Sequence, residues 1–310
     1  MTFRFREQRV LPDRRSNWLR NHGLPLLFFL FVATALSWPL VRNFSSRVLG
    51  EANSDVFHNI WAYWHVKEWL LGHQPLFETP LLYYPVGIST LAHAVGPLMG
   101  IFTAPFWAWG PAAAFNAAML IGVWLTGYFM YELVIELGID RKAALFSGAL
   151  LAAAPLHLAG LYGHVEKAFI GLLPLSLWGL ARALDVKRRA GWAVVPAAFL
   201  LLSLLHNGLQ FILAVAAVSF FSILTLGLAQ SEQRKALAHR LLVLMASSIV
   251  LVGPLLAATA RTALNPAMEV DFNYLSGAFQ PDVLELILPP NYALLLGDFT
   301  TKTINALGLW

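Results

Sequence analysis

Residues 24–41 read LPLLFFLFVATALSWPLV, a mostly apolar run without a charged side chain. A helix needs roughly 17–25 mostly apolar residues to cross a bilayer, so this run is long enough to span one. The basic residues before it are typical of a signal peptide, and Ala33-Thr34-Ala35 is similar to a cleavage site. Because the apolar run continues beyond that triplet, we expect a retained span rather than a cleaved signal peptide.

The composition indicates a membrane protein. The chain has 310 residues, of which 58% are hydrophobic and 12% are charged, and its mean hydropathy is +0.63. Soluble domains hold about 25% charged residues, so we predict an all-α polytopic membrane protein. The net charge of +4 comes from clusters beside apolar runs, and no basic face with interleaved aromatic residues supports nucleic-acid binding. The absence of cysteine excludes disulfides and a cysteine nucleophile.

Several segments are long and apolar enough to be membrane spans. They number seven: 24–42, 114–137, 143–160, 168–184, 188–205, 207–229 and 238–260. Segment 94–110 is also apolar, but its two prolines and three glycines disfavour a straight helix. We interpret 94–110 as an interfacial or re-entrant piece, and an eighth span is the alternative.

The distribution of lysine and arginine predicts the topology. These residues gather in the N-terminal segment 1–23 and in the links that follow the second, fourth and sixth spans. Cytoplasmic loops are enriched in them, so we predict a multi-pass protein of the inner (plasma) membrane with a cytoplasmic N-terminus. The transmembrane module 24–260 then contains an extracytoplasmic loop, 43–113, and the tail 261–310 lies on the same outer side.

The first loop contains an aromatic, acid-bearing stretch, GEANSDVFHNIWAYWHVKEW, at residues 50–69. On a helical projection Glu51, Asp55, His58 and His65 share one side, while aromatic residues crowd the other. The pattern predicts an amphipathic helix at the outer interface, with its polar side toward a cavity.

Asp55 is the candidate catalytic residue of this helix. If Asn53 or Ser54 is the N-cap, Asp55 falls in the first turn, where a carboxylate is available as a base or a cation ligand. An aspartate near a helix start is equally common for capping alone, and interfacial tryptophans are ordinary anchors. Glu51 and His58 are candidates for substrate binding, although for each alone a structural role is the favoured interpretation.

Further motifs follow in the same loop: GHQPLFET at 72–79, YYPVG at 83–87 and LAH at 91–93. With Asp55 and the tryptophan-rich helix, they resemble the first outer loop of the GT-C superfamily of integral-membrane glycosyltransferases. The likeness resumes at LYGHVEKAFIGLLPLSLWGLARAL, residues 161–184, and at FNYLSGAFQPDVLELILPP, residues 272–290. It follows the span pattern from about residue 24 to the end of the chain.

The resemblance implies a GT-C-like fold and a transferase that moves a sugar from a polyprenyl-phosphate donor to an acceptor at the extracytoplasmic face. Asp55 matches the loop carboxylate, which in such enzymes acts on the acceptor as a base or through a divalent cation such as Mg²⁺ or Mn²⁺. The chain departs from the pattern in two ways. Its nearest acidic partner, Glu51, is four residues from Asp55, and family members are longer, so a fragment and a partial, inactive member both stay open.

Other polar groups on the predicted outer face are candidates for substrate or metal binding. His164 and Glu166 lie in the link between the third and fourth spans, where charge is costly, and Glu166 is a candidate second metal ligand beside Asp55. The alternative is a solvated turn with a Lys167–Glu166 pair. Arg261, after the last span, is either a forked ligand for a lipid phosphate or a plain interfacial arginine.

Two other function classes remain open. A transporter or lipid flippase predicts ionisable residues or broken helices near mid-membrane in repeated halves, but the sequence shows few mid-span charges and no internal repeat. A non-catalytic membrane subunit predicts that Asp55 is replaceable.

Overall fold

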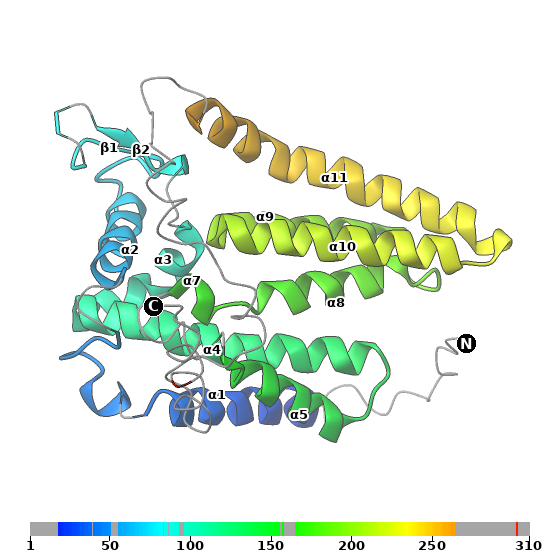
Figure 1. Ribbon diagram of the computed structural model, residues 1–310, viewed down its shortest axis with the longest axis horizontal. Helices are drawn as coiled ribbons and strands as arrows, with labels where there is room; N and C mark the ends of the chain where they lie inside the picture. Colours follow the sequence, from blue (N-terminus) through cyan, green and yellow to red (C-terminus); the bar gives the residue numbers. More distant parts are fainter. Residues whose placement is uncertain are drawn as a thin grey trace. The chain divides into compact units, whose positions relative to one another are not determined.

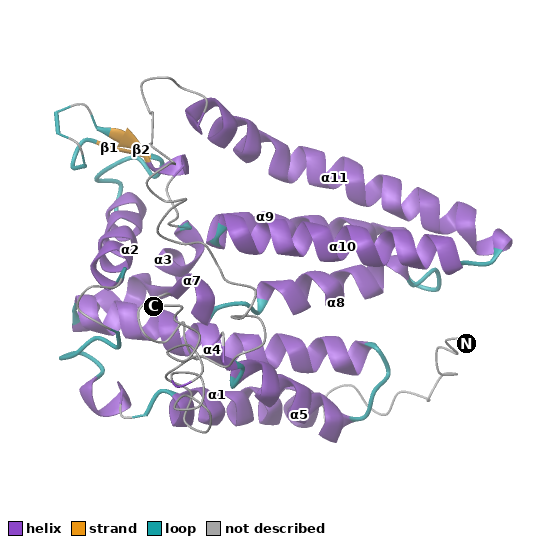
Figure 2. Cartoon of the chain, in the orientation of Figure 1, coloured by secondary structure: helices purple, strands orange, loops and turns teal. Residues whose placement is uncertain are grey.

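The structure is a computed structural model that describes residues 18–38, 40–50, 55–82, 84–85, 87–92, 96–155, 157, 165–263 and 302 (Figure 1). The chain divides into two compact units, Met1–Thr262 and Ala263–Trp310, and nearly all described residues belong to the first. The described residues are mainly helical, and two short strands among them form a hairpin (Figure 2). In chain order the elements are η1 (Leu19–Gly23), α1 (Leu24–Leu36), η2 (Leu40–Asn43), α2 (Val56–Leu70), β1 (Glu78–Thr79), β2 (Ile88–Ser89), η3 (Thr90–Ala92), α3 (Pro97–Thr103), η4 (Ala104–Trp109), α4 (Pro111–Glu136), α5 (Arg141–Ala152), α7 (Val165–Ala168), α8 (Leu172–Leu184), η5 (Ala190–Val194), α9 (Val195–His206), α10 (Gly208–Leu228) and α11 (Ser231–Ala263).

The helices confirm an α-helical membrane protein at a coarse level. By length and composition, 4 described helices are able to cross a bilayer: Leu19–Leu36, Pro111–Glu136, Gly208–Leu228 and Ser231–Thr262. The predicted third, fourth and fifth spans correspond to the shorter helices α5, α8 and η5 with α9. With 13 residues, α8 rises about 20 Å, less than the roughly 30 Å of a hydrocarbon core. The count of seven spans and the GT-C-like fold therefore stay predictions.

Segment 94–110 is broken in its described part, residues 96–110. Helix α3 ends at Thr103, and the 3-10 helix η4 follows directly, with Pro105 in its first turn. The 7 residues of α3 rise about 10 Å, so this helix does not cross a bilayer by itself. The interpretation of 94–110 as an interfacial or re-entrant piece, with an eighth span as the alternative, stays a prediction.

Glycines let α1, α4 and α5 approach one another around a phenylalanine. Phe29 of α1 is 1% exposed, and its ring fills the space that a Cβ on Gly127 of α4 or on Gly148 of α5 would occupy. Small residues are typical of helix crossings in lipid, where close backbone packing takes over from apolar burial. This crossing fixes α5 against the middle of α4.

Helices α1 and α4 run antiparallel. His22, just before α1, donates from Nδ1 to Glu132 Oε1 near the end of α4, at 2.8 Å. At the opposite end, Asn116 Nδ2 donates to the carbonyl oxygens of Phe44 and Arg47, at 2.8 and 2.7 Å. The start of α4 therefore lies beside the chain that leaves α1, and its end lies beside the start of α1.

A second apolar core joins α8, α9, α10 and α11, which Figure 1 shows running alongside one another. Its buried members are Leu180, Ala197, Leu200, Ala214, Val218, Leu244 and Val252. The outward side chains of α10 and α11 are exposed although apolar, as at Ile223 (72%) and Val250 (71%). Helices that are apolar all round are expected to meet lipid on the side that protein does not cover.

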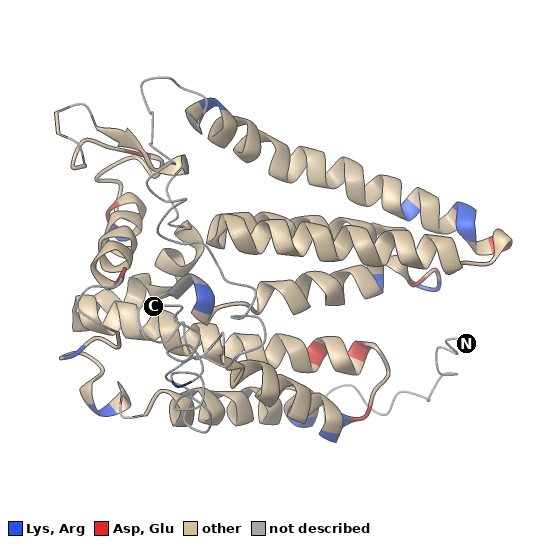
Figure 3. Ribbon diagram, viewed as in Figure 1, with Lys and Arg blue, Asp and Glu red and all other residues tan. Residues whose placement is uncertain are grey.

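Charged residues lie in and beside the links after α4, α8 and α10, at the end of this unit that we name the arginine end (Figure 3). There Arg141 donates to the carbonyl of Arg20, and Glu136 pairs with Arg182 and Arg188. The links after α4, α8 and α10 all lie at this end, as the lysine and arginine distribution predicted. Its assignment to the cytoplasm stays a prediction.

The opposite end, which we name the Asp55 end, holds α2, the β1–β2 hairpin, α3 and η4. Helix α3 meets the end of α9 there, because Gly96 packs so closely on the His206 carbonyl that no Cβ would fit. The first loop and the turn between α9 and α10 therefore lie together, away from the arginine end.

Candidate functional site

Helix α2 places Asp55 at the N-cap position. The Asp55 carbonyl accepts from the backbone N–H and the side-chain Nδ2 of Asn59, both at 2.9 Å, and Val56 is the first helical residue. The expectation that Asp55 lies in the first turn is wrong by one residue, because Asp55 itself takes the capping position. Asn53 and Ser54, the predicted N-caps, lie outside the described residues.

The packing of α2 holds Asp55 at the edge of the molecule. Val56, Asn59, Ala62, Tyr63 and Val66 form the buried stripe of the helix, which contacts α3 and α4. Their spacing of three and four residues is that of one helix face. Gly100 of α3 permits this approach, since a Cβ there would collide with Val66. Asp55 is exposed and His58 is half-buried, so the start of α2 presents a carboxylate on a firmly packed helix.

The residues of the predicted polar side of α2 differ in exposure: Asp55 is exposed, whereas His65 is buried. His65 is 3% exposed and both of its ring nitrogens are used: Nε2 donates to the Leu76 carbonyl at 3.0 Å, and Nδ1 accepts from Gln74 Nε2 at 2.8 Å. Trp61 stacks on the imidazole at 5.3 Å between ring centroids. His65 therefore has a structural role, because it fastens the loop after α2 to the helix.

A small hollow lies beside this histidine. Its volume is about 320 Å³, a value that includes the open solvent at its mouth. Its walls are mainly apolar and come from α2, the following loop and the start of α3: Trp61, Ala62, His65, Val66, Leu76, Phe77, Thr90 and Pro97. Asp55 is not in its wall. The cavity expected on the polar side of the helix is therefore not this one.

The far end of α2 carries a compact charge cluster. Glu68 accepts from Lys67 Nζ at 2.6 Å and from His73 Nδ1 at 2.7 Å, and the Lys67 ammonium lies 5.5 Å from the centroid of the Trp107 ring. The hydrogen bond from Lys67, followed by that from His73, holds the pKa of Glu68 below its ordinary value. These charges satisfy one another, which is typical of a structural cluster.

The remaining predicted site residues are only partly described. Glu51 and His164 lie outside the described residues, and Glu166 lies in α7 with a side chain that is also outside them. Arg261 is exposed in the last turn of α11, within the helix rather than after it. It lies 21 residues beyond Arg240 of the arginine end, so about 30 Å of helix carries it toward the Asp55 end.

The predicted metal ligands are Asp55 and Glu166. The part of the chain that the structure describes contains no group of three or more histidine, aspartate or glutamate side chains that would hold a metal ion. A single carboxylate with water and substrate oxygens is a known manner of Mg²⁺ binding, so Asp55 alone fits such a role. The metal role of Asp55 and Glu166 stays a prediction.

Lys167 is a charged group that the sequence pattern did not single out as a site residue. It is half-buried on α7, whose last residue, Ala168, packs its carbonyl against Gly122 of α4. Gly122 lies eleven residues into α4, about 16 Å from its start, so α7 lies between the two charged ends. Lys167 makes no ion pair with any described residue. Its position between two apolar segments is the sequence signal that points to it.

His157 fixes α7 in this place. Its ring is fully buried, with Nδ1 2.9 Å from the carbonyl oxygen of Ala152, the last residue of α5. Its Nε2 makes a short bond to the carbonyl of Ala168, the last residue of α7. One side chain therefore lies between the C-terminal ends of two helices, and the single N–H of a neutral imidazole donates to one of the two carbonyls.

The elements around α2, α7 and the end of α9 form the part of the molecule most suited to a site. Asp55 and Lys167 are its exposed acid and its half-buried cation, and His157 and His65 fasten the segments that carry them. Comparison of the chain with protein-family models, with curated proteins and with solved structures finds no match. The likeness to GT-C enzymes therefore depends on the sequence motifs alone.

Proposed function

We propose that the protein is a glycosyltransferase of the GT-C type, which moves a sugar from a polyprenyl-phosphate donor to an acceptor at the membrane surface beside α2. The observation that supports this proposal best is the placement of Asp55. It is an exposed carboxylate at the start of a helix that is packed on α3 and α4, away from the arginine end. A base held on a firmly packed element is what proton transfer from an acceptor needs.

The proposed reaction is a displacement at the anomeric carbon. The acceptor oxygen attacks that carbon, the bond from the carbon to the phosphate oxygen breaks, and the lipid phosphate leaves with the electron pair. The acceptor proton passes to the Asp55 carboxylate. Attack from the face opposite the phosphate inverts the anomeric centre.

The departing phosphate carries negative charge that a cation stabilises. Two described cations are candidates: Arg261 in the last turn of α11, and Lys167 on α7. A guanidinium accommodates two phosphate oxygens in a forked contact, whereas an ammonium acts as a point charge. We assign the donor phosphate to one of these two cations, of which Lys167 is the more buried.

Replacement of Asp55 tests the proposal. Asparagine is as good an N-cap as aspartate, so Asp55→Asn preserves α2 while it removes the base. We expect transfer from a radiolabelled polyprenyl-phosphate sugar in membranes to fall by about 10²–10⁴-fold, with unchanged expression. Glu68→Gln, at the far end of the same helix, is the matched control and keeps activity. Equal transfer by the wild type and Asp55→Asn would refute the assignment and favour a non-catalytic subunit.

The placement of Lys167 favours a second candidate, a transporter or flippase of an anionic lipid. An ionisable group between apolar segments is typical of a transport path. Lys167→Gln and Asp55→Asn separate the two functions in proteoliposomes that contain a fluorescent polyprenyl phosphate. Movement of the lipid across the bilayer that requires Lys167 but not Asp55 indicates transport, whereas sugar transfer that requires both indicates the enzyme.

A further inference from the structure

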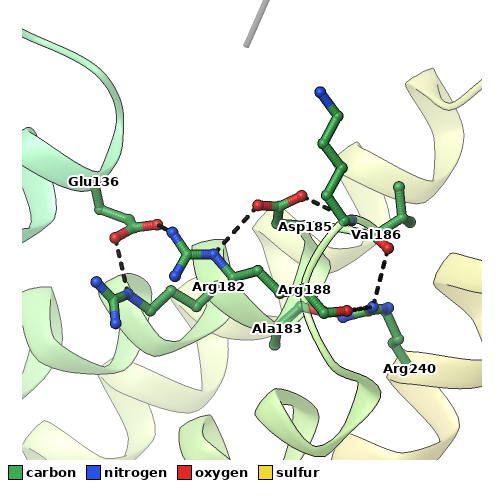
Figure 4. Close-up of polar contacts among 8 residues, drawn as sticks. Glu136, Arg182, Ala183, Asp185, Val186, Arg188 and Arg240 are labelled. Atoms are coloured by element: carbon green, nitrogen blue, oxygen red, sulfur yellow. Dashed lines mark hydrogen bonds and ion pairs between the residues drawn. The ribbon is translucent and has the colours of Figure 1, made fainter. Parts of the chain in front are cut away.

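The turn between α8 and η5, residues 185–189, forms the centre of the arginine end (Figure 4). Glu136 at the end of α4 accepts from Arg182 Nε at 2.8 Å and makes a shorter bond to Arg188. Asp185 accepts from Arg188 Nε at 3.2 Å. Two carboxylates thus neutralise two arginines, so these four side chains have little charge left for a ligand.

Arg240 brings α11 against the same turn. It is 6% exposed and donates to the carbonyls of Ala183, at 2.8 Å, of Val186, at 3.4 Å, and of Arg188 (Figure 4). Carbonyl oxygens satisfy its N–H groups but carry no net charge, and no acid among the described residues pairs with it. The positive charge of Arg240 therefore stays uncompensated behind the turn.

Four further cations lie on the outside of this contact, and we name them the basic patch: Lys187, Arg189, Arg234 and Lys235. All four are exposed, and none makes an ion pair within the described part of the chain. Lys187 and Arg189 flank Arg188, whose carbonyl accepts a hydrogen bond from Arg240. Lys235 lies five residues before Arg240 on α11, about 8 Å along the helix axis. Glu232 is the nearby acid on α11, so the cations outnumber it (Figure 3).

Two tryptophans lie beside the patch at the end of the second helical core. Trp178 of α8 and Trp192 of η5 enclose the Arg182 guanidinium, which lies 4.1 and 4.9 Å from their ring centroids. Tryptophan and arginine with this arrangement are typical of the level at which lipid head groups meet water. This arrangement supports a placement of the basic patch at head-group level.

An apolar surface begins directly beyond the patch. The last turns of α10 and the fourth turn of α11 expose large apolar side chains: Ile223, Leu224, Leu228, Leu242 and Met245. A ligand that covers both surfaces needs an anionic group joined to apolar chains. Nucleic acid and free phosphate lack the apolar part, whereas an anionic phospholipid has both.

We propose that the basic patch binds the phosphate head group of an anionic glycerophospholipid, whose acyl chains lie along the ends of α10 and α11. The uncompensated charge of Arg240 strengthens the attraction from behind. The bound lipid bridges the 185–189 turn and α11, and so stabilises the contact that Arg240 makes. This proposal does not depend on the activity at the Asp55 end.

Lipid retention by the purified full chain tests the proposal. The protein in mild detergent is mixed with phosphatidylglycerol, with phosphatidylcholine or with inorganic phosphate, and bound ligand is counted by native mass spectrometry. We expect retention of phosphatidylglycerol alone. Each cation near an anionic lipid contributes about fivefold, so Lys187→Gln with Arg189→Gln should weaken retention about 30-fold.

The matched control is Arg42→Gln with Arg47→Gln, which removes two exposed arginines away from the patch. This pair should retain phosphatidylglycerol like the wild type. Lys235→Gln, a single exposed change, serves if the double variant does not fold, and should weaken retention about fivefold. Equal retention of the two lipids, binding of inorganic phosphate alone, or patch variants that bind like the control would each overturn the proposal.

Discussion

Replacement of His157 by alanine is the sharpest test of how the Asp55 half of the molecule is held together. The ring lies between the last carbonyls of α5 and α7, and because a neutral imidazole carries one N–H, its removal leaves one buried acceptor without its donor. An unsatisfied buried acceptor costs about 1–3 kcal/mol in water-soluble proteins, and interhelical bonds in membrane proteins average about 0.6 kcal/mol. Loss of a buried ring adds a cavity, so we expect a total of about 3–5 kcal/mol.

Thermal unfolding in detergent, followed by tryptophan fluorescence, measures this loss. For a chain of this size 1 kcal/mol corresponds to about 2–4 °C, so the midpoint should fall by on the order of 10 °C. His157→Gln should recover part of the loss, because a glutamine amide carries two N–H donors whereas a neutral imidazole carries one. His239→Ala, an exposed change on α11, should alter stability by less than about 0.5 kcal/mol. A His157→Ala variant as stable as His239→Ala would refute the capping role.

Two further predictions address other parts of the structure. Gly148→Ala should destabilise the protein by about 1–3 kcal/mol, because the added methyl group collides with Phe29 and the Gly127 carbonyl. Gly191→Ala, which has open space around it, should not destabilise the protein. The same thermal assay compares the two variants, and equal midpoints would refute the close crossing. The pKa of Glu68 is lowered in the folded protein, so its stabilising contribution is present above its ordinary value of 4.5 and is lost as the pH falls through the folded value. The stability difference between the wild type and Glu68→Gln should therefore shrink on acidification, and a difference that grows as the pH falls would contradict the cluster.

The apolar pattern predicted the existence of the helices better than their ends. The predicted span 207–229 matches α10, Gly208–Leu228, because it is bounded by a capping asparagine and has no internal break. Inside the predicted span 143–160, α5 ends at Ala152, three residues before Pro155, which disfavours helix in the residue before it; residues 156 and 158–160 lie outside the described residues. In contrast, α11 begins at Ser231, seven residues before the predicted start, because its first turns are charged residues that form helix well without being apolar.

The site was harder to predict because its partners are distant in sequence. Periodicity placed His65 with Asp55 on one side of α2, but whether an imidazole is exposed depends on Gln74 and Leu76, which the pattern within α2 does not contain. His157 was not singled out at all, since its acceptors are backbone carbonyls at two helix ends, and a carbonyl leaves no sequence signature. The placement of Lys167 between the charged ends was also not predictable from its own segment, because it depends on where α5 ends and where α8 begins.

The short helices α5 and α8 explain why the two halves of the molecule differ. Gly148 of α5 lies beside Gly127, and Arg182 of α8 pairs with Glu136, so both helices accompany the half of α4 that leads to the arginine end. The other half of α4 is covered instead by α2, α3, η4 and α7, all shorter than a span. Short elements carry unpaired backbone groups at their ends, which membrane proteins tolerate only where protein or water satisfies them. His157 donates to one of these groups, and a polar substrate with its bound water is able to satisfy others. The half that contains Asp55 and Lys167 is for this reason the one in which we expect chemistry.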